Sequence, residues 1–135
     1  MGLNLFLGLF FLINKLWTKI EYIIKKIKSW DYNYKAASSS LYGSDTLLRN
    51  PDQVAANDEM SWATAFWFWK INVIGGPYGQ GVKNGQFGSS TNAINGGLEC
   101  RGSNSDKARK RFEIYKKVLI AFNINSTPNE TGCYN

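Results

Sequence analysis

The amino-acid sequence predicts a mainly α fold, and three segments lead to that prediction. Apolar residues recur at helical spacing along residues 58–71 and again along residues 106–122, and a shorter helix is expected over residues 32–41. The glycine-rich stretch 74–88 has neither helical nor strand periodicity, so we expect a long loop there. At 135 residues, 44% of them hydrophobic, the chain suffices for one core, and no second globular domain is expected.

The segment 58–71 is expected to be the buried central helix. Its helically spaced residues are Met60, Ala63, Thr64, Trp67 and Phe68, and Trp62, Phe66 and Trp69 extend the apolar surface nearly all round. An aromatic cluster can also serve as a platform on which sugars stack. Because so many rings on one helix cannot all face one groove, core packing is the favoured interpretation.

The sequence also predicts where two of the helices begin. A helix start is expected at Pro51, with Asn50 as N-cap, because the fixed φ of proline suits the first helical position. The last helix is expected to be capped by Ser105 or Asp106. Its inward face is expected to consist of Ala108, Phe112, Tyr115, Leu119 and Phe122.

Residues 1–28 differ in composition from residues 29–135, and we place a boundary between them. Residues 3–13 form an apolar run of the length found in signal peptides, too short to span a bilayer. Residues 15–28 alternate apolar side chains with lysines at helical spacing, a pattern typical of a basic helix that lies on an anionic membrane. A signal anchor and an incorrectly joined gene start are the alternatives.

The amino-acid composition argues against several classes of function. The net charge is +6, but no nucleic-acid-binding motif accompanies the lysine and arginine clusters, so no nucleic-acid partner is expected. The chain has no histidine, which argues against metal catalysis, and the glycine-rich stretch lacks the glycine-lysine-serine/threonine ending of a phosphate-binding loop. We therefore expect neither a metal nor a cofactor.

Two cysteines and two glycosylation sequons lie in the C-terminal third. The cysteines are Cys100 and Cys133, and the sequons begin at Asn125 and Asn129. Together they favour an oxidising, extracellular setting, although two cysteines can also remain buried thiols and sequons arise by chance.

Five ordered blocks resemble the substrate-cleft signature of the family 19 glycoside hydrolases, the plant-type chitinases. They lie at residues 29–34, 47–55, 63–69, 91–100 and 111–117. The block 91–100 reads Thr-Asn-Ala-Ile-Asn-Gly-Gly-Leu-Glu-Cys and differs from the family pattern at one position. The resemblance implies the C-terminal portion of a lysozyme-like α+β architecture, whose cleft binds β-1,4-linked N-acetylglucosamine.

The resemblance also assigns roles to individual residues. Ser29 would position the attacking water, Tyr32 and Asn33 would hydrogen-bond the sugar, Asn95 would line the cleft, Arg111 would neighbour the catalytic carboxylates and pair with Glu99, and Cys100 would bond to Cys133. Without the resemblance, Asn95 would be a turn residue before two glycines and Arg111 a surface charge. Two departures from the family pattern are Ile27, in place of a glutamine, and Asp31, in place of an asparagine.

The family hydrolyses chitin with inversion, which requires a carboxylic acid and a carboxylate on opposite sides of the scissile bond. The resemblance places both glutamates upstream of Ser29, where this chain has only Glu21 in an unrelated context. We therefore expect an incomplete, monomeric, extracellular chitinase that binds chitin oligomers but does not cleave them. A non-catalytic N-acetylglucosamine-binding protein and a membrane-active cationic protein are the alternatives.

Overall fold

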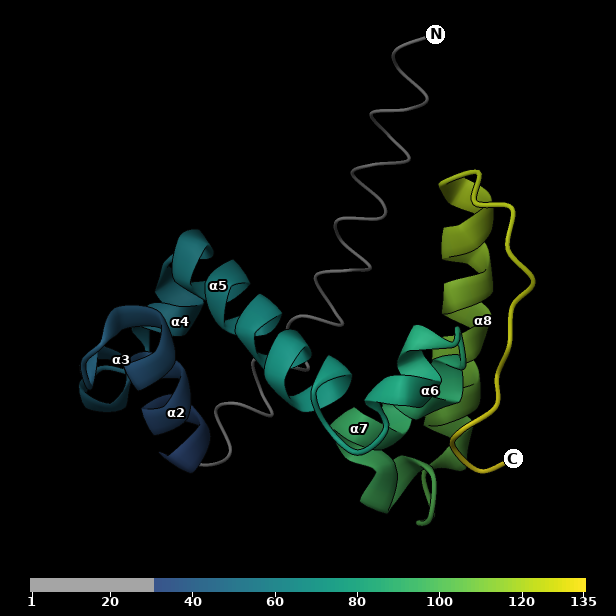
Figure 1. The fold of residues 1–135 in the computed structure, drawn as a ribbon, viewed down its shortest axis with the longest axis horizontal. Helices are drawn as coiled ribbons and strands as arrows, with labels where there is room; N and C mark the ends of the chain where they lie inside the picture. Colours follow the sequence, from purple (N-terminus) through teal and green to yellow (C-terminus); the bar gives the residue numbers. More distant parts are fainter. Residues whose placement is uncertain (1–30) are drawn as a thin grey trace, which may run out of the picture. The chain divides into compact units, whose positions relative to one another are not determined.

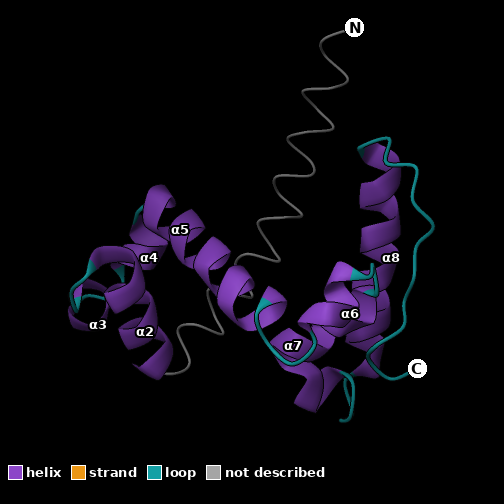
Figure 2. Cartoon of the chain, in the orientation of Figure 1, coloured by secondary structure: helices purple, strands orange, loops and turns teal. Residues whose placement is uncertain are grey.

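The computed structural model describes residues 31–135 as helices joined by turns and one extended tail (Figures 1 and 2). No β-strand forms in this part of the chain, where one isolated parallel bridge joins Gln86 to Asn129. The predicted mainly α fold is confirmed. The chain divides into two compact units, with the boundary between Trp69 and Lys70. The predictions for residues 1–28 and for Ser29 lie outside the described residues.

The described part of the first unit, residues 31–69, contains four helices. They are α2 (Asp31–Tyr42), α3 (Thr46–Arg49), α4 (Gln53–Ala56) and α5 (Asp58–Phe68). Helix α2 agrees with the helix expected over residues 32–41. Its buried Ser38 accepts a hydrogen bond from the backbone N–H of Leu47 at 2.9 Å, which fastens α3 to α2. Leu47 on α3 and Val54 on α4 are fully buried.

The predicted helix start at Pro51 is wrong by two residues. Asn50 ends α3 instead of capping the next helix, since its backbone N–H donates to the carbonyl of Thr46. A proline forces the residue before it out of the α region, and Asn50 accordingly has φ −137° and ψ 75°. Pro51 therefore lies in a turn, and α4 begins only at Gln53.

The prediction that α5 is apolar and buried nearly all round is also wrong. The residues that it buries are Ser61, Thr64, Ala65 and Phe68, spaced i, i+3, i+4 and i+7. The hydroxyl of Thr64 donates to the carbonyl of Met60 at 2.8 Å, and that of Ser61 donates to the carbonyl of Val54, so both polar groups are satisfied inside. Phe66 lies on the opposite side and is 65% exposed.

The helical run continues past the predicted end at Ile71 in a wider turn. Residues Trp69–Ile74 form the π-helix η1, and the N–H of Gly75 donates to the carbonyl of Lys70, five residues back. A β-carbon on Gly76 would collide with the carbonyl oxygen of Asn72. The glycines after η1 therefore allow the chain to turn closely against the end of that helix.

The second unit contains three further helices. They are α6 (Gly79–Lys83), α7 (Phe87–Glu99) and α8 (Ser105–Ala121). The stretch 74–88 was expected to be a loop throughout, and α6 corrects that expectation. A β-carbon on Gly81 would meet the side chains of Gln86 and Ser89 at the start of α7. Here glycine allows close packing between two helices, which its low helix propensity conceals in the sequence.

Helix α8 follows the prediction with small corrections. It begins at Ser105 after Asn104, so the cap lies one residue earlier than expected. Ala108, Phe112 and Leu119 are buried as expected, but Phe122 is 47% exposed because the helix ends at Ala121. The Phe87 ring stacks on Tyr115 at 4.6 Å between centroids and lies 5.7 Å from Phe112, which joins α7 to α8.

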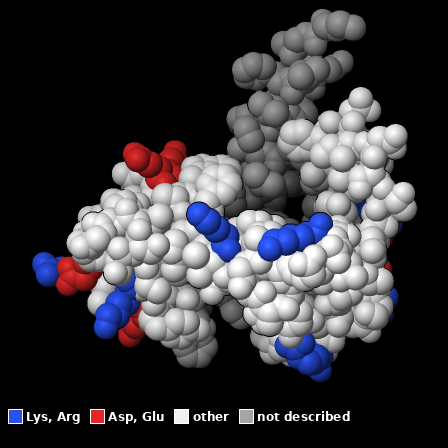
Figure 3. Space-filling view, in the orientation of Figure 1, with Lys and Arg blue, Asp and Glu red and all other residues white. Residues whose placement is uncertain are grey.

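Charged side chains lie mainly at the surface. On the face that Figure 3 draws, the Lys and Arg side chains of the described residues form small separate groups. Lys116 on α8 bonds to Glu113 at 2.6 Å, an exposed pair of the kind that adds little stability. Within residues 31–135, every helix is too short or too polar to traverse a bilayer.

Candidate functional site

Helix α7 is kinked at Asn95. This residue has φ −148° and ψ 35°, which are not helical values, although helical hydrogen bonding resumes after it. The two glycines that follow allow the break, and a β-carbon on Gly96 would collide with the side-chain oxygen of Asn92. The turn at Asn95 that the residues alone suggest is therefore present, inside a helix rather than between elements.

Asn95, Glu99 and Arg111 lie together at this kink. Nε of Arg111 donates to Oε2 of Glu99 at 2.7 Å, and Nη2 donates to Oε1 at 3.0 Å. Nδ2 of Asn95 donates to the same Oε1 at 3.0 Å. The guanidinium thus holds the carboxylate through two parallel bonds, the geometry that arginine provides and lysine cannot.

Burial makes this cluster sensitive to change. Glu99 is 1% exposed, whereas the side chain of Arg111 is 24% exposed. A buried carboxylate is stable only when it is paired and hydrogen-bonded, and its position near the C-terminus of α7 is unfavourable for a negative charge. Arg111 offsets both costs. The two bonds to Glu99 in turn fix the direction of the guanidinium.

A second polar network joins α7 to the tail, and sequence reasoning did not find it. Arg101 donates through Nη1 to Oδ1 of Asn92 at 2.6 Å and to the hydroxyl of Tyr78 at 3.4 Å. Nδ2 of Asn92 donates to the carbonyl of Gly132 at 3.0 Å. Asn92 lies inside the family-like block, but the contact to Gly132 spans 40 residues, so no local pattern could reveal it.

The tail is fastened to α7 at several points. Cys100 and Cys133 form a disulfide with their Cα atoms 4.7 Å apart, which confirms the predicted pair. The N–H of Phe87 donates to the carbonyl of Asn129 at 2.8 Å. Gly88 has no room for a side chain, because a β-carbon there would collide with the backbone of residues 130–133.

Tyr134, near the end of this tail, lies in a small charged cluster. Its ring lies under the guanidinium of Arg109 at 4.4 Å, and its hydroxyl donates to Glu130. Burial first, and then the hydrogen bond to Glu130, raises the pKa of Tyr134 to about 12. The phenol therefore stays protonated well above the pH at which an exposed tyrosine ionises.

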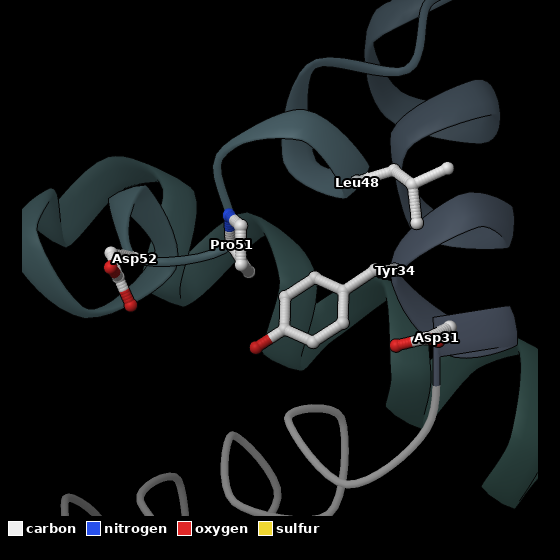
Figure 4. Close-up of a pocket in the computed structure, with 5 residues that line it drawn as sticks. All are labelled: Asp31, Tyr34, Leu48, Pro51 and Asp52. Carbon is white, nitrogen blue, oxygen red and sulfur yellow. The ribbon is translucent and has the colours of Figure 1, made fainter.

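In the first unit, Tyr32 and Asn33 are neighbours at the start of α2 but differ in burial. Tyr32 is 63% exposed, whereas Asn33 is 7% exposed. A pocket of about 220 Å³ opens beside them, lined by Asp31, Tyr34, Leu48, Pro51 and Asp52. Figure 4 shows the Tyr34 ring between Asp31 and Pro51. Burial, and then the nearby charge of Asp52, raise the pKa of Tyr34.

The structure thus brings together part of the predicted site. Asn95, Glu99 and Arg111 meet within the second unit, and Tyr32 and Asn33 lie side by side in the first. The predicted roles of Tyr32, Asn33, Asn95 and Arg111 in sugar binding stay predictions. Across residues 31–135, no cluster of three or more His, Cys, Asp or Glu side chains has the arrangement of a metal site.

Comparison with known proteins identifies the family. The family model described as chitinase class I matches residues 24–133. The acidic endochitinase SP2 of Beta vulgaris is 42% identical over 103 residues, 76% of this chain and 33% of its own length. Chitinase 4 of Oryza sativa subsp. japonica is 38% identical over 101 residues, 75% of this chain and 33% of its own length.

An inactive chitinase-like protein 1 of Hevea brasiliensis is also similar. It is 36% identical over 122 residues, 79% of this chain and 38% of its own length. The chain spans about a third of the length of these relatives. No solved structure gave a significant match. The match to the family model covers most of the sequence, and the chain therefore belongs to the class I chitinase family.

Proposed function

We propose that this chain supplies the C-terminal side of a chitin-binding cleft in a chitinase-type glycoside hydrolase. The ligand is a β-1,4-linked N-acetylglucosamine oligomer, in line with the names of the relatives and the family match. The observation that carries the proposal is the cluster of Asn95, Glu99 and Arg111, where two helices hold one arginine in a fixed direction.

The chemistry of the cluster favours a supporting role for Glu99. A general acid or base must reach the glycosidic oxygen or a water molecule. The carboxylate of Glu99 instead accepts bonds from Arg111 and Asn95 and is 1% exposed. Arg111, partly exposed, is the residue of the pair that can face a ligand, and Glu99 positions it.

Hydrolysis with inversion would need two further carboxylates. One protonates the leaving oxygen, and the other activates a water across the sugar ring. Neither family glutamate has a counterpart in the 135 residues, since Glu21 lies in a lysine- and isoleucine-rich context. Under this proposal, the 135-residue chain binds chitin oligomers and leaves their glycosidic bonds intact, with Ser29, Tyr32 and Asn33 as further contacts.

The test combines binding and turnover on the full 135-residue chain. Titration with N-acetylglucosamine oligomers should shift the NMR signals of Asn95 and Arg111, while colloidal chitin should release no reducing sugar. Asn95→Ala should weaken binding about five- to tenfold, as expected for one lost hydrogen bond. Lys110→Ala, an exposed change on the same helix as Arg111, should leave the affinity unchanged. Release of sugar, or equal affinity for Asn95→Ala and wild type, would contradict the proposal.

A non-catalytic chitin-binding protein is the second candidate. It is favoured by the similarity to the inactive chitinase-like protein of Hevea brasiliensis. The two candidates differ in what the gene encodes before Ser29. Sequencing of the transcript across that region should find two glutamate-bearing family segments if the protein is a chitinase. A transcript whose coding sequence starts at Met1 would instead favour the binding protein.

We also propose a monomeric protein outside the cell. The disulfide supports an oxidising compartment, because such bonds form and persist there.

Membrane association through residues 3–28 is a separate proposal, supported only by their apolar and basic pattern. A sedimentation assay of the full chain with anionic vesicles would test it, and failure to co-sediment would exclude it.

A further inference from the structure

The tail contains two possible acceptor sites for an N-linked oligosaccharide. The sequons begin at Asn125 and Asn129, and both asparagines are exposed. The motif alone makes them equivalent, because each has a threonine two residues later and neither has an intervening proline. Their local structures differ.

At the second sequon, the threonine hydroxyl that the motif requires is hydrogen-bonded to the side chain of Asn129. Oδ1 of Asn129 accepts hydrogen bonds from the backbone N–H of Thr131 at 3.1 Å and from its hydroxyl at 2.8 Å. This arrangement fixes the direction of the carboxamide. Two donors on Oδ1 also make the Nδ2 protons more acidic, which favours the loss of one when Nδ2 forms a new bond.

Asn125 lacks this arrangement. Its threonine, Thr127, precedes Pro128, which restricts Thr127 to extended conformations. Within the described residues, no hydrogen bond joins the side chain of Asn125 to Thr127, and the N–H of Ser126 donates instead to the carbonyl of Ile124. The first sequon therefore does not present its asparagine in the conformation seen at the second.

The backbone at Asn129 is anchored in a way that suits a bulky modification. Its carbonyl accepts from the N–H of Phe87 at 2.8 Å, and Gln86 forms the isolated bridge to the same residue. The main chain is thus fastened to the start of α7 while the side chain remains exposed. A glycan on Nδ2 would extend into solvent without displacing a buried group.

We propose that Asn129, and not Asn125, is the acceptor of an N-linked oligosaccharide. Nδ2 attacks C1 of the first sugar of an oligosaccharide carried on a polyprenyl diphosphate. The Nδ2–C1 bond forms as the bond from C1 to the diphosphate oxygen breaks, the lipid diphosphate leaves, and one Nδ2 proton passes to a base of the transferase. The inference rests on the proposed extracellular location, since the transferase acts in the secretory pathway.

Cell-free translation with microsomes tests the choice of acceptor. The full chain is fused behind a cleavable secretory leader, and protease protection scores entry into the lumen separately from glycosylation. Wild type should gain one endoglycosidase-sensitive glycan. Asn129→Gln and Thr131→Ala should lose it, whereas the matched change Asn125→Gln, and Thr131→Ser, which keeps a hydroxyl, should retain it.

Three results would overturn the proposal: a glycan on Asn125 alone, glycans on both asparagines, or protected chains without any glycan. A parallel translation without the added leader examines the proposed location independently. If the translation without the leader yields no protected chains, the result counts against the extracellular proposal. The translation with the leader still decides between Asn125 and Asn129.

Discussion

Residues 31–69 and residues 70–135 both fold into helices, but each unit is stabilised internally by a different kind of contact. In the first unit, short helices pack through small or hydroxyl-bearing residues such as Ser38, Ser61 and Thr64. In the second, a disulfide, a buried ion pair and a docked tail connect positions far apart in sequence. Stability in the first unit therefore rests on packing, and in the second on a few specific links.

This difference bears on how each unit should respond to change. A packed unit loses stability roughly in proportion to the buried apolar volume that is removed. A linked unit loses it in large steps, when one partner of a buried pair or of a disulfide disappears. The following variants test this distinction in order of decreasing effect.

The largest loss is expected when the disulfide is removed. Cys100 and Cys133 are 33 residues apart, and the loop-entropy relation gives a loss of about 4 kcal/mol in the free energy of unfolding for the double change to serine. Hydrogen exchange followed by mass spectrometry should show faster exchange in residues 70–135 only. Equal acceleration in residues 31–69 would mean that the two units do not differ in the way described.

Removal of Arg111 should cost slightly less. Arg111→Ala removes a cation that bonds to the buried carboxylate of Glu99, and we expect a loss of about 3 kcal/mol in the free energy of unfolding. Lys110→Ala on the same helix is the matched control, and its exposed side chain should cost less than about 0.5 kcal/mol. Urea titration followed by circular dichroism measures both. Similar midpoints for the two variants would show that the ion pair is not a structural link.

Packing in the first unit can be probed at two adjacent leucines. Leu47 is fully buried and Leu48 is 39% exposed. Leu47→Ala should lower the free energy of unfolding by about 2 to 3 kcal/mol, because it leaves a cavity, whereas Leu48→Ala should cost less than about 1 kcal/mol. Urea titration measures both losses from the shift of the unfolding midpoint, provided that the m-value stays constant. If Leu48→Ala were the more damaging change, the core of this unit would lie elsewhere.

The smallest effect concerns pH. The folded pKa of Tyr134 is raised from 10.0 to about 12, so folding favours the protonated phenol. This contribution to stability is complete below about pH 10 and disappears as the pH rises toward about 12. Tyr134→Phe should therefore flatten the loss of stability over that interval. An ultraviolet titration of wild type showing every tyrosine ionising near pH 10 would refute the raised pKa.

The sequence predicted the helices with clear periodicity and missed features that depend on distant partners. Helices α2 and α8 follow the expected ranges closely, since their patterns are local. The buried face of α5 was misjudged because large aromatic residues dominate any count of apolar positions. Its actual inner face carries Ser61, Thr64 and Ala65, whose burial depends on what packs against them.

The candidate site shows the same limit. A kink at Asn95 could be expected from the two glycines after it, but the bond between Glu99 and Arg111 spans two helices. No periodicity links those residues, so their pairing could be expected only through the family resemblance. The short helix α6 was hidden because glycine has a low helix propensity, although Gln80 and Asn84 bond to each other across one of its turns.

The docked tail also constrains the order in which the chain can fold during synthesis. Residues 129–133 contact Phe87, Gly88, Asn92 and Cys100, all of which are translated much earlier. Contacts that close a long loop form slowly, because the entropy of closure comes before any gain. The first unit can complete its contacts while translation continues, but α7 must wait for the tail. During that interval Cys100 remains a thiol, available to any other cysteine that it encounters.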